Sequence, residues 1–376
     1  MNERVNRQSN LELLRIVSMI LIIIHHFYVH GNIILDYDDI KIREVIMQWL
    51  ASAGKIGVNL FIMTTGYFMI NSKFKMKKLL KIEGQVLFYS VFIFLICKFA
   101  FKMNLGIKDG LISIFPVMYN NYWFITTYIL LYIFSNYINK FIKSISQKEF
   151  SVLIILLITI FSILPSVVNA KFQYSDFGWF IILYLIGAYI KIYGMKIKIF
   201  DNKERILLIM LLSILAFISI YVLDKMYFIL KIDPLKYSTP LHQLIPFSIS
   251  LLMFNFFCNL KVKNSRIINK VASCTLGVYL IHDNRFFKSI LWLKIVKTNI
   301  ISQSKYSIIF EFLAVAIIFC GACILEIIRQ NTFEKAYMKI IDKNFNKCVD
   351  NAKNIYGKIK KHIKLNKETN IWKHIL

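Results

Sequence analysis

Residues 11–30, LELLRIVSMILIIIHHFYVH, form an apolar segment long enough to cross a membrane as a helix, with an arginine near one end and histidines near the other. At about 100° and 1.5 Å per residue, Arg15 and His26 lie within roughly 20° of one helix face and about 16 Å apart along it. Glu12 and His30 continue this polar stripe. An ionised side chain exposed to lipid is costly, so the stripe must face protein or water. We therefore expect the rest of the chain to enclose it.

Further apolar runs of similar length recur along the chain. Of the 376 residues, 57% are hydrophobic and 18% are charged, whereas soluble domains have about 45–50% apolar and about 25% charged residues. The first run is too long for a signal-peptide core and lacks a small-residue cleavage site, so we expect it to be retained. We predict an all-α, polytopic integral membrane protein of about ten transmembrane helices. The predicted spans are 11–30, 46–70, 83–101, 122–142, 151–168, 177–193, 206–223, 241–260, 272–293 and 306–328.

The net charge of +26 follows the predicted topology and does not indicate a nucleic-acid partner. One side of the membrane receives 31 of the 47 lysines and arginines and the other side 15. This bias predicts that both termini are cytoplasmic and that the basic segments contact anionic lipid of the bilayer. We divide the chain into a membrane domain, 1–328, and a basic cytoplasmic tail, 329–376. The lysine run after the second predicted span is either a stop-transfer anchor or a phosphate-binding collar; it includes Lys73, Lys77 and Lys78.

Polar side chains also occur within the later predicted spans. Thr65 precedes Gly66 in the second span, and small residues there indicate close helix contact. In the fourth span, Trp123 fits an aromatic belt, and Tyr128 and Tyr132 share a deeper face where their hydroxyls need partners. For each of these residues, packing inside the protein is the alternative to a role in a site.

His282, Asp283 and Asn284 are consecutive toward one end of the ninth predicted span. Consecutive residues of a helix point to different sides, so we expect about two of the polar residues here to line an interior.

These residues and their order resemble the acyltransferase 3 family, bacterial integral-membrane acyltransferases that modify cell-surface glycans and related hydroxyl acceptors. The most specific feature of the resemblance is an arginine, ten residues and a histidine in the first span, here Arg15 and His26. The resemblance covers about residues 10–329. The supporting segments are NLFIMTTGYFMI, YWFITTYILLY, WFIILYLIGAYIKIY and TLGVYLIHDN.

Two positions depart from the family pattern. The usual serine before the glycine of the second span is Thr65, which keeps a hydroxyl. The acidic residue that many members carry after the tryptophan of the fourth span is Tyr128. The sequence thus leaves open which group orients the histidine.

The resemblance implies transfer of an acyl group, expected to be acetyl, from cytoplasmic acyl-CoA to a hydroxyl of a surface polysaccharide or its lipid-linked precursor. His26 is the expected base or nucleophile, and His25, about 100° away on the helix, is the weaker candidate. We expect neither a metal site nor a permanently bound cofactor. The expected location is the bacterial cell membrane. The resemblance also suggests other proteins of surface-polysaccharide synthesis as partners. The cations expected at the phosphates of coenzyme A are Arg15, Lys73, Lys77 and Lys78.

The sequence alone leaves two alternatives to an acyltransferase function. Polar residues within spans also occur in transporters or flippases of lipid-linked glycans, although such folds more often show repeated halves with broken helices. A non-catalytic subunit of a glycan-export system is the other alternative. Neither would transfer an acyl group to an acceptor.

Overall fold

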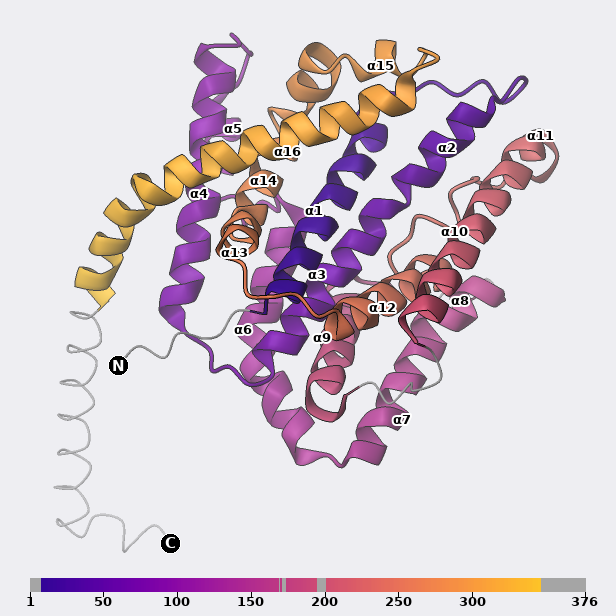
Figure 1. Cartoon of the computed structure of the whole chain (residues 1–376). Helices are drawn as coiled ribbons and strands as arrows, with labels where there is room; N and C mark the ends of the chain where they lie inside the picture. Colours follow the sequence, from indigo (N-terminus) through magenta and orange to yellow (C-terminus); the bar gives the residue numbers. More distant parts are fainter. Residues whose placement is uncertain (1–7, 169, 171–173, 195–200, 346–376) are drawn as a thin grey trace, which may run out of the picture. The chain divides into compact units, whose positions relative to one another are not determined.

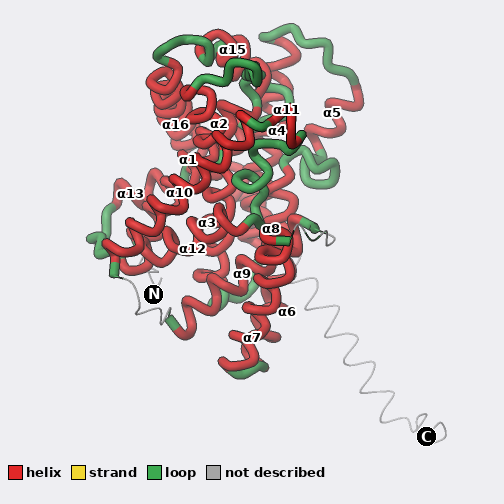
Figure 2. The backbone as a smooth tube through the Cα atoms, turned by 90° about the vertical axis from the view of Figure 1, so that its right-hand side faces the viewer, coloured by secondary structure: helices red, strands yellow, loops and turns green. Residues whose placement is uncertain are grey.

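The structure, a computed structural model, describes residues 8–168, 170, 174–194 and 201–345. The chain divides into two compact units, one of residues 1–74 and 86–326, the other of residues 75–85 and 327–376. Within the described residues the regular structure is entirely helical, as Figure 2 shows. The all-α prediction is therefore confirmed.

The first unit is built around helix α3 (Ala53–Met69), which packs against α1 (Ser9–Val29) and α9 (Asp176–Tyr193) (Figure 1). The α3–α9 contact depends on a glycine from each helix. A Cβ on Gly66 would lie 2.2 Å from the carbonyl oxygen of Tyr184, and a Cβ on Gly187 would lie 2.0 Å from that of Met63. The close helix contact expected at Gly66 is thus present.

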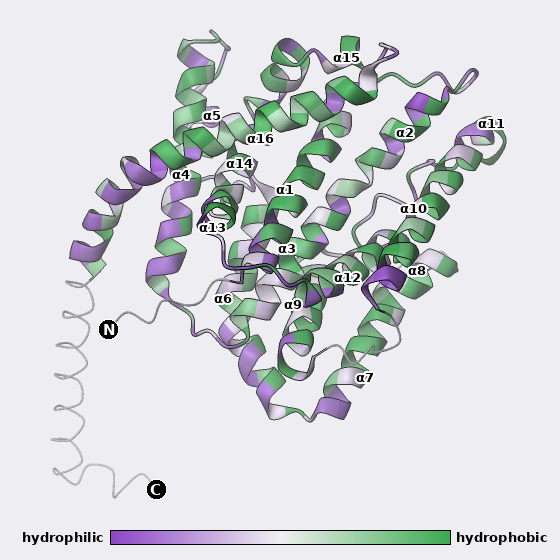
Figure 3. Ribbon diagram, viewed as in Figure 1, coloured by the Kyte–Doolittle hydropathy of each residue, from purple (hydrophilic) through white to green (hydrophobic). Residues whose placement is uncertain are grey.

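Further helices surround this centre. α12 packs against α3, α10 packs against α12 and α2, and α6 and α7 pack against α9. Few apolar side chains of α7 and α10 are buried, and many are exposed, among them Ile155 and Leu211. Figure 3 colours both helices as apolar along much of their length. Such faces suit a lipid environment. The bounds are α2 (Ile42–Ala51), α5 (Ile107–Ile114), α6 (Trp123–Ser144), α7 (Gln147–Ile158), η1 (Thr159–Ile163), α8 (Leu164–Val167), α10 (Asn202–Lys225), α11 (Tyr227–Leu230) and α12 (Leu244–Asn259).

Seven helical stretches of the described residues are long and apolar enough to cross a membrane. Three of the ten predicted spans are not among them. The region of 122–142 is the helix α6, that of 241–260 is the 16-residue apolar helix α12, and that of 272–293 is broken. The count of ten and the cytoplasmic termini remain predictions. The seven stretches are Ser9–Val29, Ile42–Met69, Met76–Phe99 (α4), Gln147–Val167, Asp176–Tyr193, Asn202–Lys225 and Ser307–Asn331 (α16).

The predicted ninth span is not one continuous helix, which corrects the sequence-based expectation. Helix α14 ends at His282, and a turn leads to the π-helical segment η2 (Ile290–Ile295). The Oδ1 atom of Asn284 accepts a hydrogen bond from the backbone N–H of Phe286, 2.9 Å away. This bond satisfies a backbone donor outside the helix and stabilises the turn. The short helices α13 (Arg266–Ala272), α14 (Thr275–His282) and α15 (Thr298–Ile301) belong to the same region.

The described part of the second unit is held by ion pairs. Nζ of Lys77 lies 2.8 Å from Oδ1 of Asp342, and the carboxylate of Glu334 pairs with both Lys81 and Arg329. Acidic side chains thus neutralise part of the predicted lysine run. Residues 346–376 of the predicted basic tail lie outside the described residues.

Candidate functional site

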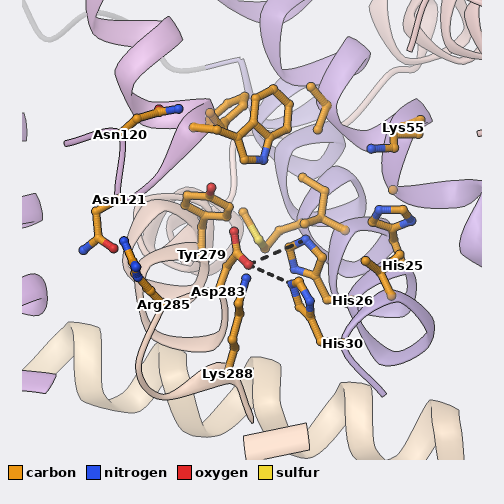
Figure 4. Close-up of a pocket in the computed structure, with 17 residues that line it drawn as sticks. His25, His26, His30, Lys55, Asn120, Asn121, Tyr279, Asp283, Arg285 and Lys288 are labelled. Carbon is orange, nitrogen blue, oxygen red and sulfur yellow. Dashed lines mark hydrogen bonds and ion pairs between the residues drawn. The ribbon is translucent and has the colours of Figure 1, made fainter. Parts of the chain in front are cut away.

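A cavity of about 420 Å³ lies in the first unit, at the end of α1 that carries the histidines. Its walls come from α1, the start of α3, the start of α6 and the turn that follows α14 (Figure 4). The aromatic residues Trp123, Phe124 and Tyr279 form part of its lining. The remaining polar lining residues are His25, His26, His30, Lys55, Asn120, Asn121, Asp283, Arg285 and Lys288.

His26 is held by a second histidine from the distant α14. Its Nδ1 lies 2.9 Å from Nε2 of His282, and Nδ1 of His282 lies 2.6 Å from the carbonyl oxygen of Val278. A carbonyl only accepts hydrogen bonds, so Nδ1 of neutral His282 carries the proton and its Nε2 is an acceptor. Nδ1 of His26 then donates to that acceptor. In neutral His26 this arrangement places the free lone pair on Nε2, as a general base requires.

The carboxylate of Asp283 faces the same nitrogen. Its Oδ1 lies 4.0 Å from Nε2 of His26 and 3.0 Å from Nε2 of His30 (Figure 4). A carboxylate at this position favours a positive charge on His26. His30 was not among the predicted site residues, although its spacing of four residues from His26 on the polar stripe was a usable signal.

His26, His30 and Asp283 also form a group that could bind a metal ion, because their candidate ligand atoms lie within 4.8 Å of one another. Two imidazoles and a carboxylate suit zinc or another divalent transition metal. A metal bound to Nε2 of His26 would occupy the lone pair needed for base catalysis. The expectation that the site works without a metal therefore stays a prediction.

His25 and Lys55 form another side of the cavity. Nδ1 of His25 donates to the carbonyl oxygen of Ala51, and a Cβ on Gly54 would lie 2.3 Å from the Cβ of His25. Glycine at position 54 thus makes room for the histidine. Lys55 was not among the predicted site residues; the signal for it was an ionisable side chain within a predicted apolar span.

Arg15 lies in a separate polar group toward the other end of α1. Its Nη1 donates a hydrogen bond to Oε2 of Glu12 at a distance of 3.0 Å, and one third of the Arg15 side chain is exposed. Tyr128 shares a hydrogen bond with Thr65 and is close enough to Arg15 for an electrostatic interaction. The structure therefore brings Arg15, Thr65 and Tyr128 together. Tyr128, at the position where the family usually has an acidic residue, lies beside Arg15. His26 is instead oriented by His282.

Two other candidates have structural contacts. The ring of Tyr132 is buried, with its centroid 5.2 Å from that of Phe74. The side-chain amide of Asn284 donates to the hydroxyl of Tyr122 and, as described above, stabilises the turn after α14. Neither of them lines the cavity.

The three candidate lysines are divided between the two units. Lys73 is an exposed residue of the first unit, whereas Lys77 and Lys78 belong to the second, where Lys77 pairs with Asp342. Their expected role at the phosphates of the donor stays a prediction.

The sequence model of the acyltransferase 3 family, described as an acyltransferase domain, matches residues 8–327. No curated protein and no solved structure matches the chain.

Proposed function

The chain belongs to the acyltransferase 3 family, and we propose that it is a bacterial multi-pass membrane enzyme that transfers an acetyl group from cytoplasmic acetyl-CoA to a glycan hydroxyl. The acceptor is a cell-surface polysaccharide or its lipid-linked precursor. The observation that carries this proposal is the free lone pair on Nε2 of His26, inside a polar cavity that a substrate can enter. Acyl transfer to an alcohol needs such a base near the attacking oxygen.

The proposed reaction assigns a role to each of three side chains. Nε2 of His26 takes the proton of the acceptor hydroxyl as its oxygen attacks the thioester carbonyl. The tetrahedral intermediate collapses with cleavage of the carbon–sulfur bond, and the departing thiolate takes the proton from His26. Asp283 stabilises the transient imidazolium, and His282 holds the ring so that Nε2 faces the substrate.

The donor is bound toward the opposite end of α1, where Arg15 interacts with the phosphates of coenzyme A. A guanidinium suits this role because it can form paired hydrogen bonds to phosphate oxygens. The expected separation of Arg15 and His26 along the helix, about 16 Å, is comparable with an extended pantetheine arm. One helix would then provide both the phosphate anchor and the base.

The test is transfer of radiolabelled acetyl from acetyl-CoA by the purified full-length protein in lipid nanodiscs. The acceptor is envelope glycan isolated from cells of the source bacterium in which the gene for this protein is deleted. We expect label in the glycan with wild type and a loss of about 10²–10⁴-fold with His26→Ala. A correctly inserted His26→Ala protein that keeps full activity would exclude His26 as the base. A flippase or a non-catalytic subunit would label no glycan even as wild type.

A further inference from the structure

Three cationic side chains line the cavity around His26. Lys55 lies on the His25 side, whereas Arg285 and Lys288 lie on the Asp283 side (Figure 4). Among the described residues, none of the three forms an ion pair. Arg285 is exposed, whereas Lys55 and Lys288 are half-buried. Lys55 interacts with the carboxylates of Asp176 and Asp283 only at longer range, so no carboxylate of the described residues within 4.0 Å neutralises any of the three cations.

Among the described residues that line the cavity, Asp283 provides the single carboxylate, which does not balance these three charges. Asp283 is directed toward His30 and His26, at 3.0 and 4.0 Å. The half-buried Lys55 and Lys288 are partly desolvated in the cavity, and a negatively charged occupant would offset that cost. The charge distribution thus indicates an anionic ligand at this end of α1, away from Arg15.

The rest of the lining suits a sugar. Trp123, Phe124 and Tyr279 provide aromatic surfaces for the apolar faces of a ring, and the amides of Asn120 and Asn121 can both donate and accept hydrogen bonds. A cavity of about 420 Å³ falls within the usual range of small-molecule sites, about 300–1,000 Å³. Aromatic surfaces, amides and cations together match an acidic saccharide unit.

We propose that the acceptor is an anionic glycan, and that Arg285, Lys288 and Lys55 bind a carboxylate or phosphate near the hydroxyl that is acylated. This inference rests on the proposed function and specifies its substrate class. A neutral glycan would supply no charge to offset the three cations, so the site selects against it by charge. His26 then acts on a hydroxyl whose sugar is already oriented by its anionic group.

The experiment uses total envelope glycan from cells that lack the protein, which contains the unmodified acceptor. Portions are left native, carboxyl-reduced with carbodiimide and borohydride, or dephosphorylated with mild hydrofluoric acid. Each is incubated with the full chain in nanodiscs and radiolabelled acetyl-CoA, then separated by anion exchange. We expect the label in the acidic fraction of the native glycan, and an at least tenfold loss of label after one treatment. The treatment that removes it distinguishes carboxylate from phosphate.

Charge-neutral variants test the residues. Arg285→Gln combined with Lys288→Gln should raise KM for native glycan at least tenfold and weaken its dependence on ionic strength; Lys55→Gln is tested separately. Lys294→Gln is the matched control, because Lys294 is exposed in the same region but does not line the cavity.

The outcomes separate the two proposals. Label in a neutral glycan that survives both treatments would overturn the anionic-acceptor inference and leave the acyltransferase function intact. The inference would also fail if the Arg285 and Lys288 variants kept the wild-type KM. An absence of label from every glycan sample would contradict the proposed function, and this inference with it.

Discussion

Nδ1 of His26 lies 2.9 Å from Nε2 of His282, so the central histidine of the first helix is held by a residue 256 positions later in the chain. Since His282 in turn donates to the carbonyl oxygen of Val278, the hydrogen bonds run in one direction. This direction determines which nitrogen of His26 can act as a base. The catalytic proposal therefore depends on the packing of α14 against α1.

Replacement of His282 tests this orientation. His282→Phe removes the acceptor for Nδ1 of His26, and we expect kcat to fall about 10–1,000-fold with little change in KM for acetyl-CoA. His282→Gln should recover part of the loss, because its amide oxygen can accept the same hydrogen bond. Steady-state kinetics of the three proteins provide the measurement. Equal activity of the Phe and Gln variants would argue against a hydrogen-bonding role.

Asp283 and His30 can be distinguished by a matched pair of variants. Asp283→Asn keeps the size of the side chain but removes the charge opposite the His26 imidazolium, so kcat should fall about 10–100-fold. His30→Gln leaves that carboxylate in place and should have the smaller effect. The comparison requires single-turnover rates at saturating acetyl-CoA. A larger loss with His30→Gln would reverse the two assignments.

Arg15 should affect the donor more than the chemistry. Arg15→Gln retains a donor for Glu12 but loses the charge, so KM for acetyl-CoA should rise about tenfold or more. Tyr128→Phe, which removes a hydroxyl beside Arg15, should have a weaker effect of the same kind. Acetyl-pantetheine, which lacks the nucleotide, is the control donor. If Arg15→Gln impairs both donors equally, Arg15 does not bind the nucleotide end.

Chelation tests the proposed metal-free mechanism against metal binding by His26, His30 and Asp283. We expect the purified enzyme to keep its rate after dialysis against EDTA, because the reaction uses the free lone pair of His26. Elemental analysis of the same sample should find no stoichiometric metal. Loss of activity on dialysis with recovery on addition of zinc would assign these three residues as metal ligands instead.

The α3–α9 contact should tolerate no added methyl group. Gly66→Ala and Gly187→Ala each place a Cβ within 2.2 Å of a backbone carbonyl oxygen of the facing helix, so each should reduce the free energy of unfolding by about 1–3 kcal/mol. Gly321→Ala is the control, because a Cβ there has no neighbour within 4 Å. Thermal unfolding in the same detergent would compare the three variants, and an equal melting temperature for all of them would contradict the prediction.

The region of 272–293 shows a break that hydropathy does not predict. Its nearly continuous hydrophobicity predicted one helix, because hydropathy does not distinguish an unbroken span from two helical segments joined by a turn. The turn is stabilised by the side chain of Asn284, a local hydrogen bond with no periodic signal. Lys55 is a lysine within a predicted apolar span, but only the packing of α3 against α1 places it in the cavity with His25 and His26.

The sequence alone determined the helical class, the polar stripe from Arg15 to His26 and the need for small residues at Gly66. These properties depend on neighbours along the chain, namely hydropathy over one span, side-chain spacing on one helix and side-chain size. The tertiary structure decided the partners: His282 and Asp283 at His26, and Tyr128 at Arg15. Such pairings depend on how separate helices pack, and the periodicity within one helix carries no information about which residue of another helix it will meet.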